Sequence, residues 1–401
     1  MKKYMRSAKR LLLLGGLAVL LAGSFSSVRL PAQQVKVTDP ATIVLIVSRD
    51  SNEIVYMDIR NNSIVGRTFL GNNVNPHMVM MSPDGRYVVT GGTRANKAFI
   101  IDAHTLQLVK VIPVDIAPEH LAFSPDSRWY YQGNPEGDSI SVIDMQSLTK
   151  IKTIPGFAEP LNVTFTTDGS KAYVGNYGAN WVGVIDVRRH ELLKKIQIAP
   201  PPGVARLDPD RYLGEIHGIN NATPTLDGRF LYAAAGTLGV VGVIDTREDK
   251  VIKVLRVGAD PWRVYMGHDG KYAIVPNNGD ETISIIDVEA NKVAATLEAG
   301  PDMTGVNFAA GKAFVISSTT GFVYVYDMKS LRPAGRIKIG TNVQLETATT
   351  DAADQKLYLA ESTNHEVVII DARTQAITRV GNVGLYPWGT HVMDSKDNYC
   401  H

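Results

Sequence analysis

Residues 173–186 read Tyr-Val-Gly-Asn-Tyr-Gly-Ala-Asn-Trp-Val-Gly-Val-Ile-Asp, a stretch in which two short apolar runs flank a polar turn. Its ending, Ile-Asp or a close variant, recurs along the chain. The recurring aspartates are Asp58, Asp102, Asp144, Asp186, Asp245, Asp287, Asp327 and Asp371. They are 40 to 44 residues apart, except for the 59 residues between Asp186 and Asp245. One period therefore spans the chain, and one copy of the repeat carries an insertion.

Each copy contains four short runs rich in β-branched and other apolar residues, separated by turn residues. Such runs predict four consecutive antiparallel strands. Asp-Gly recurs at 84–85, 168–169, 227–228 and 269–270, where glycine supplies the positive φ of a tight hairpin. We expect the aspartate that closes each third strand to accept backbone N–H groups of the following turn. That role is structural rather than catalytic.

Four-stranded sheets repeated at this period predict an all-β protein, a β-propeller of four-stranded antiparallel blades. The first copy begins at Thr42 without an opening strand, and residues 387–401 resemble an opening strand without its continuation. Pairing of the N- and C-terminal strands would close the ring and give eight blades. Seven blades are the alternative, if one degenerate copy forms no full sheet.

The motif Tyr173-Val174-Gly175-Asn176, followed by Val184-Ile185-Asp186, resembles the YVTN-type β-propeller repeat family. The resemblance covers essentially the whole chain after its N-terminal segment. It implies the propeller fold, but it implies no particular activity, because propellers host many unrelated functions.

The N-terminus has the pattern of a secretory signal peptide. Five basic residues within 2–10 precede an apolar run at 11–22, and small residues follow. The run has 12 residues, whereas a membrane-spanning helix needs about 20. We therefore predict a signal peptide at 1–32, rather than the alternative of an uncleaved anchor, and a single propeller domain at 33–401. We expect an exported protein, in the periplasm or an equivalent internal bacterial compartment, with no transmembrane span in the mature chain.

Charge and cysteine content exclude other classes of protein. The whole chain has a formal net charge of +1, and residues 1–32 hold six basic and no acidic residues, which leaves −5 for the rest. No basic patch for nucleic acid is present, so we expect no nucleic-acid partner. The single cysteine, Cys400, allows no internal disulfide.

No catalytic motif is evident. The sequence has no phosphate-binding Gly-rich loop, no Gly-x-Ser-x-Gly motif and no His-Glu-x-x-His motif. The tail Asp-Asn-Tyr-Cys-His at 397–401 resembles the second half of a Cys-x-x-Cys-His haem attachment site, but Asp397 replaces the first cysteine. We therefore expect no covalently bound haem on this chain and favour a non-catalytic subunit over a catalytic one.

Several polar and aromatic residues stand near the starts of the opening strands when the copies are aligned on the turn aspartate. These channel-mouth candidates are His77, His120, Asn162, Trp262, Arg263 and His391. Histidine can ligate a metal or haem, arginine can hold an anion, and tryptophan offers a stacking face. The fold could bring them to one mouth of the central channel, although each could instead satisfy local hydrogen bonds in its own loop.

The insertion lies at about 199–217 and begins with three prolines, which favour an extended and semi-rigid segment. Two interpretations compete. A partner-docking arm would use Arg206, Arg211 and Tyr212. An oxygen-rich cation site would use Asp208, Asp210 and Glu215, although their spacing matches no regular cation loop, which favours the arm.

Three functional hypotheses follow. The first is an exported, non-catalytic propeller subunit of a multi-subunit haem redox complex, with haem c on partner chains. In size and architecture the chain resembles the propeller subunits of hydrazine synthases, and that resemblance implies haem-bearing partners that condense nitric oxide with ammonium to hydrazine in the anammoxosome. The second is a propeller that itself binds a non-covalent d1-type haem or a metal, with His77, His120, His217 and His391 as candidate ligands. The third is a metal-dependent hydrolase.

Overall fold

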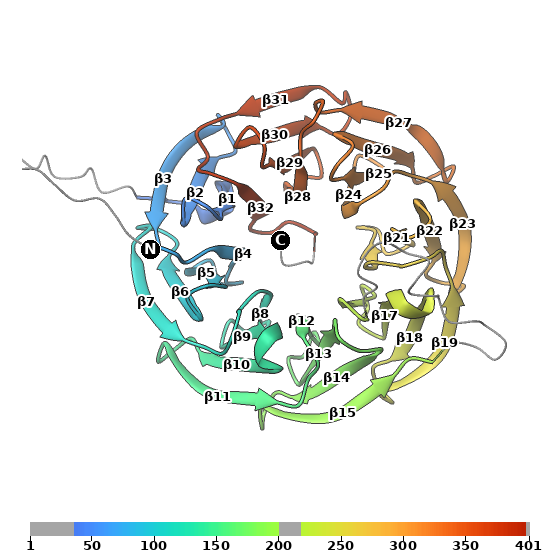
Figure 1. Cartoon of the computed structure of the whole chain (residues 1–401), viewed down its shortest axis with the longest axis horizontal. Helices are drawn as coiled ribbons and strands as arrows, with labels where there is room; N and C mark the ends of the chain where they lie inside the picture. The colour runs from blue at the N-terminus through green and yellow to red at the C-terminus, as the bar shows by residue number, and fades with distance from the viewer. Residues whose placement is uncertain (1–35, 200–217, 398–401) are drawn as a thin grey trace, which may run out of the picture. The chain divides into compact units, whose positions relative to one another are not determined.

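The computed structural model describes residues 36–199 and 218–397, and these form eight four-stranded antiparallel sheets arranged in a ring (Figure 1). The prediction of an eight-bladed β-propeller is confirmed, and the seven-bladed alternative is wrong. Helix in the described residues is limited to short 3-10 turns such as Pro40–Thr42, Pro135–Gly137 and Gly236–Leu238. None of the helices in this part of the chain is long and apolar enough to cross a membrane.

Each blade uses four strands that are successive in the chain, except blade 1. Blade 1 contains β32 (Pro387–Val392), β1 (Ile43–Ser48), β2 (Glu53–Asp58) and β3 (Ser63–Phe69). Blade 2 contains β4 (Pro76–Met81), β5 (Tyr87–Gly92), β6 (Lys97–Asp102) and β7 (Leu108–Pro113). Blade 3 contains β8 (Leu121–Phe123), β9 (Trp129–Asn134), β10 (Ser139–Asp144) and β11 (Thr149–Pro155). Blade 4 contains β12 (Pro160–Phe165), β13 (Lys171–Asn176), β14 (Trp181–Asp186) and β15 (Glu191–Gln197).

The second half of the ring follows the same order. Blade 5 contains β16 (Ala222–Pro224), β17 (Phe230–Ala235), β18 (Val240–Asp245) and β19 (Lys250–Arg256). Blade 6 contains β20 (Tyr265–Met266), β21 (Tyr272–Asn277), β22 (Thr282–Asp287) and β23 (Lys292–Glu298). Blade 7 contains β24 (Met303–Ala309), β25 (Lys312–Ser317), β26 (Phe322–Asp327) and β27 (Arg332–Lys338). Blade 8 contains β28 (Leu345–Thr350), β29 (Lys356–Glu361), β30 (Glu366–Asp371) and β31 (Ile377–Val380).

The ring closes as the repeat predicts. β32, from the C-terminal end, pairs antiparallel with β1 and becomes the innermost strand of blade 1, with Leu45 opposite His391. Figure 1 shows the two coloured ends of the chain meeting in this blade. β1 therefore has an inner partner, as the second strand of every other blade does.

The hydrophobic core is divided among the blade interfaces. Each of eight buried clusters joins two neighbouring blades, and the one that contains Val44, Val392 and Tyr358 joins blade 8 to blade 1. In β6, Ala98 and Ile100 pack toward blade 3, whereas Phe99 and Ile101 pack toward blade 1. Because successive strand residues face opposite sides of a sheet, both faces of each blade are buried.

The aspartate of each repeat has the structural role that the sequence predicts. All eight carboxylates accept a backbone N–H from the turn that follows the third strand. The hydrogen bond from the Ser330 N–H, for example, lowers the pKa of Asp327. These carboxylates therefore fix the turns between the third and outermost strands.

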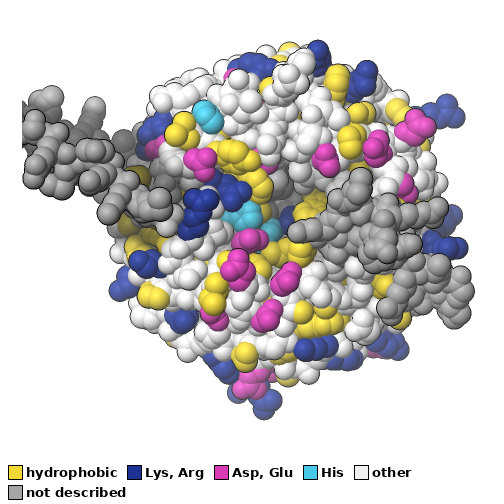
Figure 2. All heavy atoms as spheres, in the orientation of Figure 1, with side chains coloured by type: hydrophobic (Ala, Val, Ile, Leu, Met, Phe, Trp, Pro, Cys, Tyr) yellow, Lys and Arg dark blue, Asp and Glu magenta, His cyan; other side chains and the backbone are white. Residues whose placement is uncertain are grey.

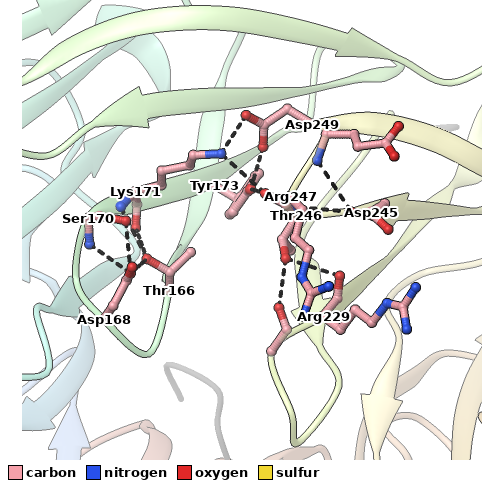
Figure 3. Close-up of polar contacts among 12 residues, drawn as sticks. Thr166, Asp168, Ser170, Lys171, Tyr173, Arg229, Asp245, Thr246, Arg247 and Asp249 are labelled. Carbon is pink, nitrogen blue, oxygen red and sulfur yellow. Dashed lines mark hydrogen bonds and ion pairs between the residues drawn. The ribbon is translucent and has the colours of Figure 1, made fainter.

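The Tyr-Val-Gly-Asn motif joins one blade to the next. Tyr173 Oη and Lys171 Nζ both donate to the Asp249 carboxylate of blade 5, at 2.5 and 2.6 Å (Figure 3). A side chain at Gly175 would overlap the carbonyl of Asn220, which leads into the innermost strand of blade 5. Asn176 accepts the Ala158 N–H at 3.0 Å and thereby holds the loop that enters its own blade. Gly175 and Asn176 thus position loops at the face where the chain enters the innermost strands, whereas Tyr173 contacts a turn at the opposite face.

Candidate functional site

At one face of the ring, the central channel widens into a cavity of about 550 Å³. Antiparallel strands reverse direction at each turn, so the loops that lead into the innermost strands share this face with the turns between second and third strands. The lining residues with polar or aromatic side chains include His77, Glu119, His120, Glu136, Glu159, Tyr177, Asn220, Trp262, Arg263, Glu346 and Trp388. The volume is in the range of small-molecule and cofactor sites.

Figure 2 shows this face hollowed at its centre. Histidine side chains lie in the hollow, acidic side chains gather on one side of it, and basic side chains lie on the other.

The structure brings four of the six channel-mouth candidates to this cavity: His77, His120, Trp262 and Arg263. The other two, Asn162 and His391, line a second cavity of about 550 Å³, bordered by the turns that follow the innermost strands at the opposite end. The expectation of one shared mouth is therefore wrong for Asn162 and His391. A strand advances about 3.3 Å per residue, so His391 lies roughly 10 Å further along the channel than Trp388. In β12 the pairing is irregular between Pro160 and Val163, and Asn162 faces the second cavity.

Arg263 spans the channel from blade 6 toward blade 3. Its Nε donates to Asn220 Oδ1 at 2.9 Å, and Nη2 lies 3.3 Å from His120 Nε2. A guanidinium can only donate, so His120 Nε2 accepts, which places the proton of a neutral His120 ring on Nδ1. Arg263 is buried, with 6% of its surface exposed, and its charge faces the cavity.

His77 and Glu119 form a close pair on the wall of the cavity. His77 Nδ1 is buried without a hydrogen bond and lies 3.6 Å from Glu119 Oε2. Burial, together with the charges of Arg49 and Arg263, lowers the pKa of His77 to about 3. Burial raises the pKa of Glu119 to about 7; the charge of Arg49 opposes this shift, and the charge of Glu136 contributes to it. The 3.6 Å contact is therefore a pair with a neutral imidazole, not an ion pair.

An aromatic wall stands beside His77. The His77 and Trp388 ring centroids are 5.1 Å apart, and His77 and His120 are 6.1 Å apart. The Arg49 guanidinium makes a cation–π contact with Trp388, 4.3 Å from the ring centroid. It also donates to Asn75 Oδ1 at 3.1 Å. Arg49 thereby fixes the plane of Trp388.

A second buried carboxyl lies on the blade 8 side. Glu346 Oε1 accepts the Ser362 hydroxyl at 2.7 Å, and burial raises the pKa of Glu346. The cavity thus combines one arginine, a neutral imidazole, flat aromatic faces and two carboxyls whose pKa values are raised by burial.

Arg49, Glu119, Glu346 and Trp388 were not among the residues expected from the sequence. Signals in the sequence could have identified two of them, Glu119 and Arg49. Glu119 is adjacent in sequence to the candidate His120. Arg49 lies in a turn between second and third strands, which the propeller topology places at the same face as the loops that enter the innermost strands.

In the residues that the structure describes, no group of three or more His, Cys, Asp or Glu side chains is arranged to hold a metal ion. The proposed docking residues Arg206, Arg211 and Tyr212 lie outside the described residues, as do Asp208, Asp210, Glu215 and His217, the predicted signal peptide and Cys400.

The YNCE-like beta-propeller family matches residues 14–211. The match spans just under half of the chain, and the described residues form a β-propeller throughout. The resemblance to a propeller-repeat family that the sequence motif indicates is confirmed. No curated protein matches the chain.

Solved structures share the propeller fold of this chain. The dihydro-heme d1 dehydrogenase NirN in complex with DHE superimposes with a TM-score of 0.74 and 16% identity, covering 91% of this chain and 78% of that one. Kuenenia stuttgartiensis hydrazine synthase gives a TM-score of 0.56 and 21% identity, covering 78% and 97%. A functionally unknown protein from Desulfotomaculum acetoxidans gives a TM-score of 0.56 and 12% identity, covering 88% and 98%. At these identities the comparisons concern the fold.

Proposed function

We propose that this propeller binds an iron tetrapyrrole non-covalently in the cavity at the channel mouth. The observation that carries the proposal is the convergence of a buried neutral imidazole, aromatic side chains and a buried guanidinium in one cavity of about 550 Å³. Each is a group that a flat, carboxylate-bearing iron cofactor requires. A bound iron tetrapyrrole would supply electron transfer or ligand exchange at its iron, and the residue that binds the iron would tune its potential.

His77 is the residue best suited to hold the iron. An imidazole binds a metal through a nitrogen lone pair, so it must be neutral. Burial and two neighbouring arginines keep His77 neutral across the physiological range. His120 is less suitable, because its Nε2 already accepts from Arg263.

The other residues suit the flat ring and its substituents. Trp388, Trp262 and Tyr177 line the cavity and offer stacking surfaces. Arg263 has donors beyond those used by Asn220 and His120 and can bind a carboxylate. NirN, with which the fold superimposes over most of both chains, is described in complex with DHE, and this similarity supports a tetrapyrrole as the ligand class.

The proposal is tested by titrating the purified full chain with haemin and with iron-free protoporphyrin, followed by absorbance. Wild type should bind haemin saturably at one per chain with a shifted Soret band. His77→Ala should weaken haemin binding at least about tenfold, which corresponds to about 1.4 kcal/mol, and leave protoporphyrin binding nearly unchanged. His391→Ala, a histidine of the second cavity, is the matched control and should behave as wild type. Wild type without saturable haemin binding would contradict the proposal.

A second candidate is a scaffold subunit in a redox complex with haem-bearing partners. The similarity to hydrazine synthase supports this second candidate, since the match covers 97% of that chain. The insertion at 199–217 is a segment that the other copies of the repeat lack, so a partner chain could dock on it. Isolation of the native protein with its partners, followed by mass spectrometry, would identify haem-bearing chains. Replacing residues 199–215 by a short turn should reduce co-purification of those chains and leave the melting temperature of the isolated protein nearly unchanged. Undiminished co-purification would contradict docking through the insertion.

A further inference from the structure

Glu119 stands behind His77 in the wall of the cavity. The two residues come from different blades: His77 is the second residue of β4, and Glu119 lies two residues before β8. The Glu119 carboxylate approaches His77 only from the Nδ1 side, where Nδ1 itself has no accessible surface. About 11% of the His77 side chain is exposed, and that exposure belongs to ring atoms other than Nδ1.

We propose that Glu119 is a positioning residue that holds the proton of His77 on Nδ1 and so directs the Nε2 lone pair into the cavity. The inference rests on the proposed function, since it assigns the orientation of the imidazole that would bind iron. A neutral imidazole has a single N–H, and its other nitrogen carries the lone pair. Histidines that bind metals commonly donate their second ring N–H to a carboxylate, which fixes the tautomer and increases the basicity of the ligating nitrogen.

The geometry allows this hydrogen bond with a small movement. The distance of 3.6 Å between Nδ1 and Oε2 is too long for a hydrogen bond. A shift of roughly 0.7 Å would bring it to the 2.7–2.9 Å typical of a charge-assisted bond. Glu119 can make this shift because about 30% of its side chain remains exposed, whereas His77 is confined by the Trp388 ring at 5.1 Å.

The neighbouring charges fit the same arrangement. Arg49 and Arg263 both act on Glu119 and on His77, and both favour a carboxylate over a second proton on the imidazole. His120 cannot substitute for His77 in this role, because its Nε2 accepts from Arg263. The two histidines of the cavity therefore differ in their partners: His77 Nδ1 faces Glu119, whereas His120 Nε2 faces Arg263.

The first measurement uses wild type without a ligand. Selective ¹⁵N labelling of histidine, with His77 assigned through His77→Gln, should show His77 with its proton on Nδ1. A proton on Nε2 would overturn the proposal.

The second measurement is the reduction potential of haemin bound to the full chain. Glu119→Gln keeps the size of the side chain but removes its charge, so iron(III) loses stabilisation and the potential should shift to more positive values. Haemin affinity should fall about tenfold. Glu159→Gln removes the same charge from the same cavity, but Glu119 is the carboxyl that is paired with His77. Its effect on the potential and on haemin affinity should therefore be clearly smaller than that of Glu119→Gln.

The two proposals fail in different ways. If wild type binds no haemin, the proposed function is wrong, and the tautomer measurement still tests Glu119. If haemin binds through His77 but Glu119→Gln and Glu159→Gln give the same potential as wild type, the assignment of Glu119 is wrong and the proposed function stands. If both variants shift the potential equally, Glu119 acts only through its charge, and the positioning role is overturned.

Discussion

His77 and Glu119 show how burial sets charge at the level of single residues. Water cannot fully solvate either side chain in the wall of the cavity, so the neutral form of each is favoured: the pKa of His77 falls to about 3 and that of Glu119 rises to about 7. Arg263, in the same wall, donates to Asn220 Oδ1. The ligand-facing surface is thus less acidic than its glutamates suggest.

A pH-dependent stability follows for Glu119. Its carboxyl has a pKa of about 7 in the folded chain and an ordinary value of 4.5, so the folded state binds a proton that the unfolded state has released between these pH values. The unfavourable contribution of the buried carboxylate is therefore absent below pH 4.5 and complete above about pH 7. Glu119→Gln removes it. The melting temperature of Glu119→Gln minus that of wild type should therefore be larger at pH 8 than at pH 5.

The comparison with Glu159→Gln separates this effect from general charge removal. His77 contributes with the opposite sign, since its lowered pKa favours the folded state as pH rises from about 3 to 6.5. All three proteins compared, wild type, Glu119→Gln and Glu159→Gln, contain His77 and share this contribution. If the melting temperatures of Glu119→Gln and wild type differ by the same amount at pH 5 and at pH 8, Glu119 titrates as an exposed carboxyl and the prediction is wrong.

Between elements, a repeated side-chain contact links the second strand of one blade to the outer turn of the next. Tyr131 Oη pairs with His190 Nδ1, Tyr173 Oη donates to Asp249, and Tyr232 Oη donates to Asn291. The three turn residues all have positive φ, between 47° and 53°. The left-handed conformation aims each side chain back toward the preceding blade, so the turn both reverses the chain and joins the blades.

Asp249 tests the strength of this contact. Asp249→Ala removes the carboxylate that accepts from Tyr173 and Lys171 and leaves them only the Thr246 carbonyl, at 3.2 Å from each (Figure 3). The free energy of unfolding should therefore fall by about 1–3 kcal/mol. Asp249→Asn retains an acceptor that resembles Asn291 and should lose less. Glu248→Ala, in the same turn, removes only an exposed ion pair with Lys250 and should change stability by less than about 1 kcal/mol. Denaturant unfolding measures all three, and equal effects of Asp249→Ala and Glu248→Ala would contradict a specific contact between blades.

The strands and the closure of the ring could be predicted because they follow from local rules. Turn aspartates, Asp-Gly hairpins and apolar runs repeat with one period, and each has a direct conformational effect. The missing opening strand at the N-terminus and the extra one at the C-terminus identified the shared blade.

The candidate site was only partly predictable, for two physical reasons. Alignment on a turn aspartate fixes the outer strands, but the innermost strands are irregular: β20 has only two residues, and the pairing of β12 shifts before Val163. Positions along the channel therefore do not follow from the repeat, as Asn162 and His391 show. The second reason is burial. Glu119 and Glu346 look like solvated loop charges until the closed ring buries them.

At the scale of the whole molecule, the C-terminal end ties several blades together. Beyond β32, Asp397 accepts from Asn307 Nδ2 at 2.8 Å and from the Thr350 N–H at 2.7 Å, and it lies 3.1 Å from His268 Nε2. These partners belong to blades 7 and 8 and to the first turn of blade 6. The same segment supplies Trp388 to the cavity, so closure of the ring and completion of the site depend on one stretch of chain.

Deletion of residues 387–401 tests closure directly. It removes β32, so β1 loses its inner partner and exposes a row of unpaired backbone groups, and the cluster between blades 8 and 1 loses Val392. An exposed inner edge is a template for pairing with another chain, so the truncated protein should aggregate, and its melting temperature should fall. Deletion of residues 398–401 alone keeps β32 and Asp397 and should leave a stable monomer. Light scattering and thermal unfolding measure both. A monomer with wild-type melting temperature after deletion of 387–401 would show that blades 1 and 8 pack without the terminal strand, and that the ring does not need closure to hold its shape.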